Sequence, residues 1–354
     1  MTSETGFTPL QRVLTTLGHE EPDRVPLFLL LSITGAKFAG TSIKEYFTDG
    51  ARVAESQLRM QERYRNDCLY GFYYASAEVE PFGGSTLFFS DGPPNAGAPP
   101  IRSGADIDSL VAPDPMSSVV LCRVLETQRI LKAEAGDRIP IIGEVISPFS
   151  LPIMQMGFEA YLNLMFEEPG RFHKLMEVNE EFCVNWANAQ LEAGATAITY
   201  FDPVSSTTVI TPEHYRKTGH EVAKRTIARI NGPTVTHLAS GNCIPILDDI
   251  VTTGTRVVGV SSLEDLRVLK EKAMGKLTLL GNMNGVEMAR WTLEQAEMIV
   301  KRAIAQAGPG GGFILADNHG EIPWQVSDEV LMAISDAVRR WGSYPLDWIR
   351  ADEI

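Results

Sequence analysis

Several ionisable and amide side chains stand at the ends of apolar, β-branched stretches that are typical of β-strands. Glu144 lies at the end of 139–145, Asp202 follows 196–201, and His237 lies in 234–238. Two later stretches, 277–281 and 313–316, are followed by further polar residues: Asn282, Asn284, Asp317, Asn318, His319, Gly320 and Glu321. In a barrel of parallel strands all carboxyl ends meet at one face, so these side chains can converge. Two imidazoles and several carboxylates are a donor set for a divalent metal.

Each of these side chains also has a structural interpretation. A histidine at a strand end can satisfy hydrogen bonds of its surroundings without touching a ligand. Asp202 precedes Pro203 and can close an Asx turn, and Glu144 can lie in a partly exposed loop. The residues alone leave both interpretations open.

The elements that would position these residues alternate along the chain. Strand-like stretches occupy 25–33, 68–75, 139–145, 196–201, 234–238, 256–260, 277–281 and 313–316, with helical patterns between them. Thr292 and Gln295 have the spacing of a helix capping box. The alternation predicts an α/β fold, a (β/α)8 TIM barrel in which residues 1–354 form one domain. An N-terminal helix at 9–17, a hairpin near 86–89 and a surface loop at 93–115 would be its additions.

The bulk properties narrow the class of protein. A chain of 354 residues with 44% hydrophobic residues can bury a large core, and a net charge of -14 argues against nucleic acid as a partner. The longest apolar run, 25–33, is too short to span a bilayer, and residues 1–8 lack the pattern of a signal peptide. The four cysteines form no C-x-x-C pair, which excludes a zinc ribbon. We therefore expect a soluble, cytoplasmic protein without membrane contact.

Aromatic residues follow the second strand-like stretch. Tyr70, Tyr73 and Tyr74 could wall an apolar pocket at the same face as the polar residues, or they could pack in the core. The sequence does not decide between the two.

Several segments resemble the uroporphyrinogen decarboxylase superfamily, which also contains corrinoid-dependent methyltransferases. They are TPLQRVLTTLGHEEPDRVPL at the start, GEVISPFSLPIMQMGFEAYL, the Asp202-Pro203 strand end, HLASGNCIPILDDIVTTG and NHGEIPW. The resemblance covers nearly the whole chain and implies the same (β/α)8 fold.

The chain departs from both branches of that superfamily. The decarboxylases carry two arginines soon after the first strand, where this chain has only Lys37, and their aspartate and tyrosine after the second and third strands are also missing. Methyltransferases that activate a thiol hold zinc through a His-x-Cys pair and a later cysteine. His237 matches that histidine, but Ala239 stands at the cysteine position and His319 stands about where the later cysteine would be. The chain is thus more similar to the methyltransferase branch, with nitrogen and oxygen donors in place of thiolates.

This resemblance implies an enzyme that removes a methyl group from a methoxylated, aromatic substrate and passes it to the cobalt of a corrinoid protein. Zinc would act as a Lewis acid on the leaving oxygen. The expected metal ligands are His237, His319 and Glu144; the expected catalytic residues are Asp202, His319 and Glu144; the expected substrate-binding residues are Tyr70, Tyr73, Tyr74, Asn282 and Trp324. The alternatives are a tetrapyrrole decarboxylase, a methyltransferase from methylcorrinoid to a thiol or pterin, and a non-catalytic corrinoid-binding protein. The resemblance to the decarboxylases also implies a homodimer.

Overall fold

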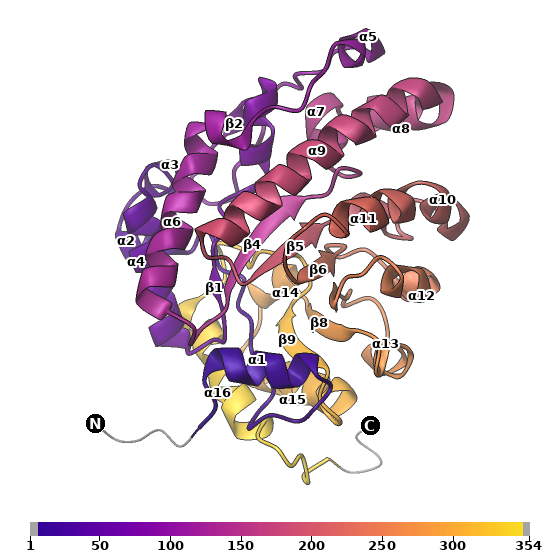
Figure 1. Ribbon diagram of the computed structural model, residues 1–354. Coiled ribbons are helices and arrows are strands. Elements are labelled where there is room, and N and C mark those ends of the chain that lie inside the picture. The colour runs from indigo at the N-terminus through magenta and orange to yellow at the C-terminus, as the bar shows by residue number, and fades with distance from the viewer. Residues whose placement is uncertain (1–5, 350–354) are drawn as a thin grey trace.

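The computed structural model describes residues 6–349, and a curled parallel sheet forms its centre (Figure 1). The strands are β1 (Leu69–Tyr70), β2 (Thr86–Leu87), β3 (Asn95–Ala96), β4 (Ile141–Ile146), β5 (Ala197–Phe201), β6 (Thr234–His237), β7 (Val257–Gly259), β8 (Thr278–Met283) and β9 (Phe313–Asp317). Seven of them pair in parallel in the order β1-β4-β5-β6-β7-β8-β9. β2 and β3 pair antiparallel, which confirms the expected hairpin.

Helices follow the strands and cover the outer face of the sheet (Figure 1). The α-helices are α1 (Pro9–Leu17), α2 (Gly35–Ala39), α3 (Ile43–Tyr46), α4 (Gly50–Tyr64), α5 (Gly104–Asp108), α6 (Val119–Ala135), α7 (Pro152–Met156), α8 (Phe158–Glu167), α9 (Pro169–Ala193), α10 (Pro212–Lys217), α11 (Gly219–Ile227), α12 (Leu247–Val251), α13 (Leu266–Ala273), α14 (Gly285–Met288), α15 (Leu293–Ala307) and α16 (Asp328–Trp341). Short 3-10 helices occupy Ala75–Glu78, Glu80–Phe82, Pro115–Ser117, Pro203–Ser205 and Ile244–Ile246. Helix α15 begins with the capping box expected from Thr292 and Gln295.

The stretch 25–33 does not form the regular strand that its composition predicts. Leu27 makes an isolated parallel bridge to Leu315 of β9, but the N–H of Leu31 turns back to the carbonyl oxygen of Leu29 at 3.0 Å. A backbone group used in such a turn is lost to the strand ladder. The curled parallel α/β sheet is therefore confirmed, whereas an eighth regular strand is absent from residues 6–349.

Side chains from the strands, from helix α1 and from the segments that precede the strands form an apolar layer on the inner face of the sheet. Its buried members are Val13, Phe28, Leu30, Cys68, Tyr70, Ile142, Val235, Val257, Leu280, Ile314 and Ala316. On the outer face, one side of the long helix α9 is buried, including Leu175, Phe182 and Trp186. This apolar layer covers the inner face of the sheet below the carboxyl ends of the strands. A polar site can therefore be built only at those ends.

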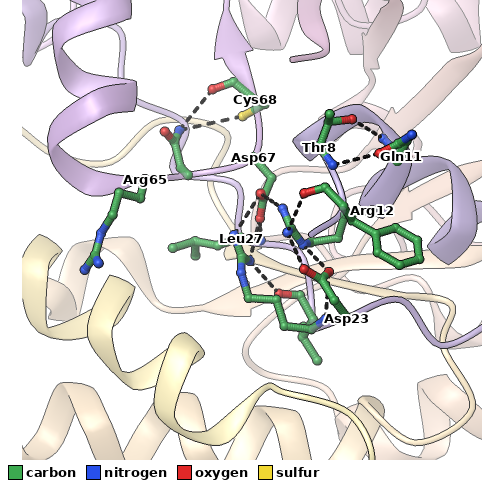
Figure 2. Close-up of polar contacts among 12 residues, drawn as sticks. Thr8, Gln11, Arg12, Asp23, Leu27, Arg65, Asp67 and Cys68 are labelled. Atoms are coloured by element: carbon green, nitrogen blue, oxygen red, sulfur yellow. Dashed lines mark hydrogen bonds and ion pairs between the residues drawn. The ribbon is translucent and has the colours of Figure 1, made fainter. Parts of the chain in front are cut away.

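A buried ion network fixes the N-terminal segment to the sheet (Figure 2). Asp67, directly before β1, has one carboxylate oxygen 2.6 Å from Arg12 Nη1 of α1 and the other 2.7 Å from Arg24 Nη1. The second oxygen also accepts the backbone N–H of Leu27 at 2.8 Å. Arg12 in turn contacts Asp23 at 2.6 Å. Through this network, Asp67 holds α1 and the segment that bridges to β9.

No helix in the part of the chain that the structure describes is long and apolar enough to cross a membrane. The division into a single domain, the homodimer and the cytoplasmic location stay predictions.

Candidate active site at the carboxyl ends of the strands

Glu144 and Tyr70 form the buried centre of the site. Gln190 of α9 holds the backbone of Glu144, because its side chain accepts the Glu144 N–H at 3.1 Å and donates to the Glu144 carbonyl at 2.8 Å. The Tyr70 hydroxyl, from the end of β1, lies 2.6 Å from Glu144 Oε2 and 3.0 Å from the carbonyl oxygen of Gly320. The site thus joins β1, β4 and the loop after β9.

The protonation of Glu144 depends on its burial and on the contacts of the Tyr70 hydroxyl. A carbonyl oxygen only accepts, and a hydroxyl has one proton to donate. Tyr70 can donate its single proton to Glu144 Oε2 or to the Gly320 carbonyl, but not to both at once. Burial raises the pKa of Glu144 to about 8, and the negative charges of Glu321 and Asp317 add to the rise, while the Tyr70 hydrogen bond opposes it. Glu144 therefore holds a proton at neutral pH.

Two further carboxyl groups lie close to this pair. Asp317, the last residue of β9, accepts the backbone N–H groups of His319 at 2.8 Å and Gly320 at 3.1 Å through Oδ2, and burial raises its pKa to about 6. Its Oδ1 is buried without a hydrogen-bond partner. Glu321 accepts the N–H of Ile33 at 2.8 Å, and burial raises its pKa to about 8. Glu144, Asp317 and Glu321 are called the acid cluster below.

His237 ends β6 as the sequence predicts, and it is fully buried. Its ring stacks on Phe201, with ring centroids 5.6 Å apart and an angle of 20°. Its Nδ1 accepts the backbone N–H of Ala239 at 3.1 Å, whereas its Nε2 has no partner. Burial lowers the pKa of His237 to about 4, and the nearby His319 contributes to the fall. His237 is therefore a neutral imidazole.

The metal site implied by the sequence resemblance needs three or four donors around one point. Within residues 6–349, no three His, Cys, Asp or Glu side chains are arranged to hold a metal ion. His237 already uses Nδ1 for Ala239, and Glu144 bonds to Tyr70. The described donors do not fit zinc, so the ligand set of His237, His319 and Glu144 stays a prediction that this geometry does not favour.

Asp202 is fully buried, and neighbouring serines use its side chain. Its Oδ1 accepts the hydroxyl groups of Ser147 at 2.6 Å and Ser150 at 2.7 Å. Burial raises its pKa. With both serines bonded to it, Asp202 organises the loop after β4; its side chain makes no cap hydrogen bond to Pro203–Ser205, so the Asx turn that its structural interpretation predicted is not formed.

The expected aromatic wall is divided between the site and the core. Only Tyr70 reaches the acid cluster. Tyr73 bonds Thr127 of α6 at 2.7 Å, and Tyr74 packs edge-on against Phe47. β1 ends at Tyr70, so the residues after it do not follow the inward and outward alternation of a strand.

Trp324 and Asn282 have partners outside the acid cluster. The Trp324 ring contacts Lys37, whose Nζ lies 4.5 Å from the ring centroid. Asn282 donates to the carbonyl of Ser261 at 3.1 Å and lines a cavity of about 770 Å³. The cavity is also lined by Ser262, Glu264, Asn284, Arg290, Trp291 and Arg302, but by no member of the acid cluster.

Asp317 and Glu321 are the site residues that sequence reasoning left out of its catalytic set. Both were visible at the end of the last strand-like stretch, within the segment 317–321. Nothing in the sequence showed that this loop folds back so that Gly320 reaches Tyr70. The signal that the sequence did offer was a carboxylate at a strand end, Asp317, followed three residues later by a glycine, Gly320.

Gly259 of β7 leaves the space that the His237 ring occupies. A Cβ at position 259 would lie 2.4 Å from His237 Cδ2, closer than real contacts allow. We expect Gly259→Ala to displace the ring and to lower the free energy of unfolding by about 1–3 kcal/mol. Denaturant unfolding measures the change. Gly285→Ala is the control, because its Cβ would lie 3.4 Å from His319 Nδ1 and needs little adjustment; equal losses in the two variants would contradict the assignment.

A parallel α/β sheet with buried carboxyl and imidazole groups at the carboxyl ends of its strands is the architecture of barrel enzymes. Residues 8–341 match the model of the uroporphyrinogen decarboxylase (URO-D) family, and the chain belongs to this family. This finding confirms the resemblance seen in the sequence.

Individual relatives agree with this membership. The chain is 24% identical to a uroporphyrinogen decarboxylase of Thioalkalivibrio sulfidiphilus, over 94% of this chain and 97% of the relative. It is 28% identical to a uroporphyrinogen decarboxylase of Methylococcus capsulatus, over 81% and 83%. Among solved structures, a methyltransferase from Methanosarcina mazei superposes with a TM-score of 0.84 at 23% identity, over 94% of this chain and 99% of that one. At this identity the last likeness shows the shared fold alone.

Proposed function

We propose that this protein is a methyltransferase that moves a methyl group from a methoxylated, aromatic substrate to the cobalt of a corrinoid carried by a partner protein. The family membership and the fold shared with a methyltransferase of Methanosarcina mazei support a place in the methyltransferase branch. A decarboxylase acting on a tetrapyrrole is the second candidate, favoured by the names of the curated relatives.

The acid cluster is the observation that carries the proposal. Glu144, Asp317 and Glu321 place three buried carboxyl groups at the carboxyl ends of the strands. A substrate with many carboxylates needs arginine or lysine partners, and it would be repelled here by the negative charge of Asp317, the member of the acid cluster that is ionised at neutral pH. A neutral ether oxygen meets no such repulsion, and a protonated carboxyl can donate to it.

In the proposed reaction, the cobalt(I) of the corrinoid supplies the electron pair for the new bond to the methyl carbon. The bond between that carbon and the ether oxygen breaks, and its electron pair stays on the oxygen. Glu144 gives its proton to this oxygen, so that a neutral phenol leaves, and solvent returns a proton to Glu144 afterwards. Tyr70 orients the Glu144 carboxyl through the 2.6 Å hydrogen bond.

A direct comparison of the two candidate reactions tests the proposal. The protein is incubated without air with reduced cobalamin and a panel of methoxylated arenes, and separately with uroporphyrinogen. We expect the cobalt(I) absorption band to disappear with at least one arene, together with one phenol released per methyl group. Loss of carboxyl groups from uroporphyrinogen, with no change of the cobalt spectrum, would favour the decarboxylase.

The proton on Glu144 predicts how the rate depends on pH. A carboxyl with a raised pKa is protonated below that value, so methyl transfer should be full at neutral pH and should fall as the pH rises through about 8. The free energy of unfolding changes in the same direction but over a lower window: it falls as the pH rises from the ordinary value of 4.5 to about 8, where the folded state binds more protons than the unfolded state. Single-turnover rates across the range measure the first effect. A rate that rises through pH 8 would contradict a general acid at this position.

A further inference from the structure

The His237 ring is fixed in one orientation by three neighbours. Phe201 stacks on one side at 5.6 Å, and Gly259 lies so close that a Cβ there would be 2.4 Å from His237 Cδ2. Near Cε1 lies Gly320, whose added Cβ would be 3.7 Å away. The ring is therefore held in one orientation, in which Nδ1 and Nε2 each face a fixed set of neighbouring atoms.

The backbone of Ala239 determines which nitrogen of His237 carries the proton. Ala239 has a φ of 51°, a left-handed conformation that is uncommon for a residue with a side chain. This turn directs its N–H to His237 Nδ1 at 3.1 Å. Because Nδ1 accepts this hydrogen bond, the single proton of the neutral imidazole lies on Nε2. That N–H group is buried and has no partner.

Nδ1 of His319 also accepts a hydrogen bond, but from a side-chain amide. The amide of Asn318 satisfies all of its contacts when its nitrogen donates to the Met283 carbonyl at 2.9 Å and to His319 Nδ1 at 2.8 Å. In this orientation its oxygen accepts from the hydroxyl and the N–H of Ser262, both at 3.2 Å. The proton of a neutral His319 then also lies on Nε2.

We infer that His237 and His319 act as N–H donors to the substrate oxygen through Nε2, in the place where relatives with thiolate ligands hold a metal. A metal-binding histidine donates its other ring N–H to an acceptor, which fixes the ligating nitrogen without a proton. Here the other nitrogen faces a donor in both residues, so ligation by Nε2 would require an imidazolate. Ala239 and Asn318 are the positioning residues of this pair.

The inference rests on the proposed function for the identity of the oxygen, which is the one released as the methyl group departs. Two N–H groups aimed at that oxygen would stabilise its growing negative charge before Glu144 protonates it. The tautomers themselves can be measured without methyl transfer, so failure of the function and failure of the inference are distinguishable.

The first measurement is nuclear magnetic resonance of the protein labelled with nitrogen-15 in histidine. Long-range correlations at neutral pH should show the proton of His237 on Nε2, with signals assigned by comparison with His237→Gln. Adding zinc chloride should leave the pattern unchanged. A proton on Nδ1, or a zinc-dependent loss of the Nε2 proton, would overturn the inference whatever the methyl-transfer assay shows.

The second measurement is the dissociation constant of phenol, the class of the product, in variants that separate donation from ligation. A glutamine amide can donate from about the position of Nε2 but is a poor zinc ligand. We expect His237→Leu to weaken phenol binding about tenfold to a hundredfold and His237→Gln to weaken it about threefold or less. His173→Leu removes an imidazole that is exposed on α9 and has no part in the site, so it is the matched control and should bind as the wild type does.

Thermal unfolding of each variant separates loss of fold from loss of binding. Equal weakening by leucine and glutamine in folded variants would overturn the donor role. Stoichiometric binding of zinc by the wild type, lost in both variants, would restore the metal-ligand interpretation. If the wild type does not bind phenol, the released oxygen is not the acceptor of the two N–H groups, even when the tautomers are the expected ones.

Discussion

Glu144→Gln is expected to lower the rate of methyl transfer from a methoxylated arene about 10²–10⁴-fold. The amide keeps the size of the carboxyl and can still accept the hydrogen bond of Tyr70, but it has no proton to give to the leaving oxygen. Fast mixing with reduced cobalamin measures the rate through the cobalt(I) absorption.

The matched control for this variant is a donor whose leaving group needs no proton. A methyl sulfonium compound releases a neutral sulfide, so Glu144→Gln should transfer its methyl group at a rate close to that of the wild type. An equal loss with both donors would mean that the substitution damages binding or folding. A rate for the arene within about threefold of the wild type would remove Glu144 from the role of general acid.

Asp67→Ala is expected to lower the free energy of unfolding by about 3–5 kcal/mol, because it leaves the guanidinium groups of Arg12 and Arg24 buried without their shared partner. Both arginine side chains are about one-tenth exposed, at 8% and 11%, so water replaces little of the lost interaction. The N–H of Leu27 also loses its acceptor. Equilibrium unfolding in denaturant measures the loss.

Asp336→Ala provides the comparison on the surface. Asp336 pairs with Arg65, and their side chains are 57% and 46% exposed. Exposed pairs contribute about 0–1 kcal/mol, so this variant should unfold nearly as the wild type does. If the two aspartate variants lost the same stability, the network in Figure 2 would not be what fixes the N-terminal segment.

The sequence predicts which residues lie at strand ends better than it predicts what those residues contact. His237 stands at the last residue of β6 and Asp317 at the last residue of β9, because apolar, β-branched stretches end at polar residues there. Glu144 lies inside β4, where Gln190 of α9 bonds its backbone and Tyr70 bonds its side chain, a tertiary arrangement that no local pattern indicates.

Contacts made by the backbone could not be predicted from the sequence. The orientation of His237 depends on a left-handed turn at Ala239, and alanine gives no signal of that conformation. The metal prediction considered which donor types were present, but not whether their nitrogen atoms were already in use. The same holds for Tyr73, which bonds Thr127 of a helix 54 residues away in the chain.

Transfer of a labelled methyl group tests the central claim most directly. An arene carrying a carbon-13 methoxyl group is mixed with the protein and with a corrinoid protein whose cobalt is reduced, and the products are followed by nuclear magnetic resonance. The proposed function predicts one labelled methyl group on cobalt for each phenol released, at a rate that falls as the pH rises through about 8. Label that stays on the arene across the panel, while uroporphyrinogen loses its carboxyl groups under the same conditions, would contradict it.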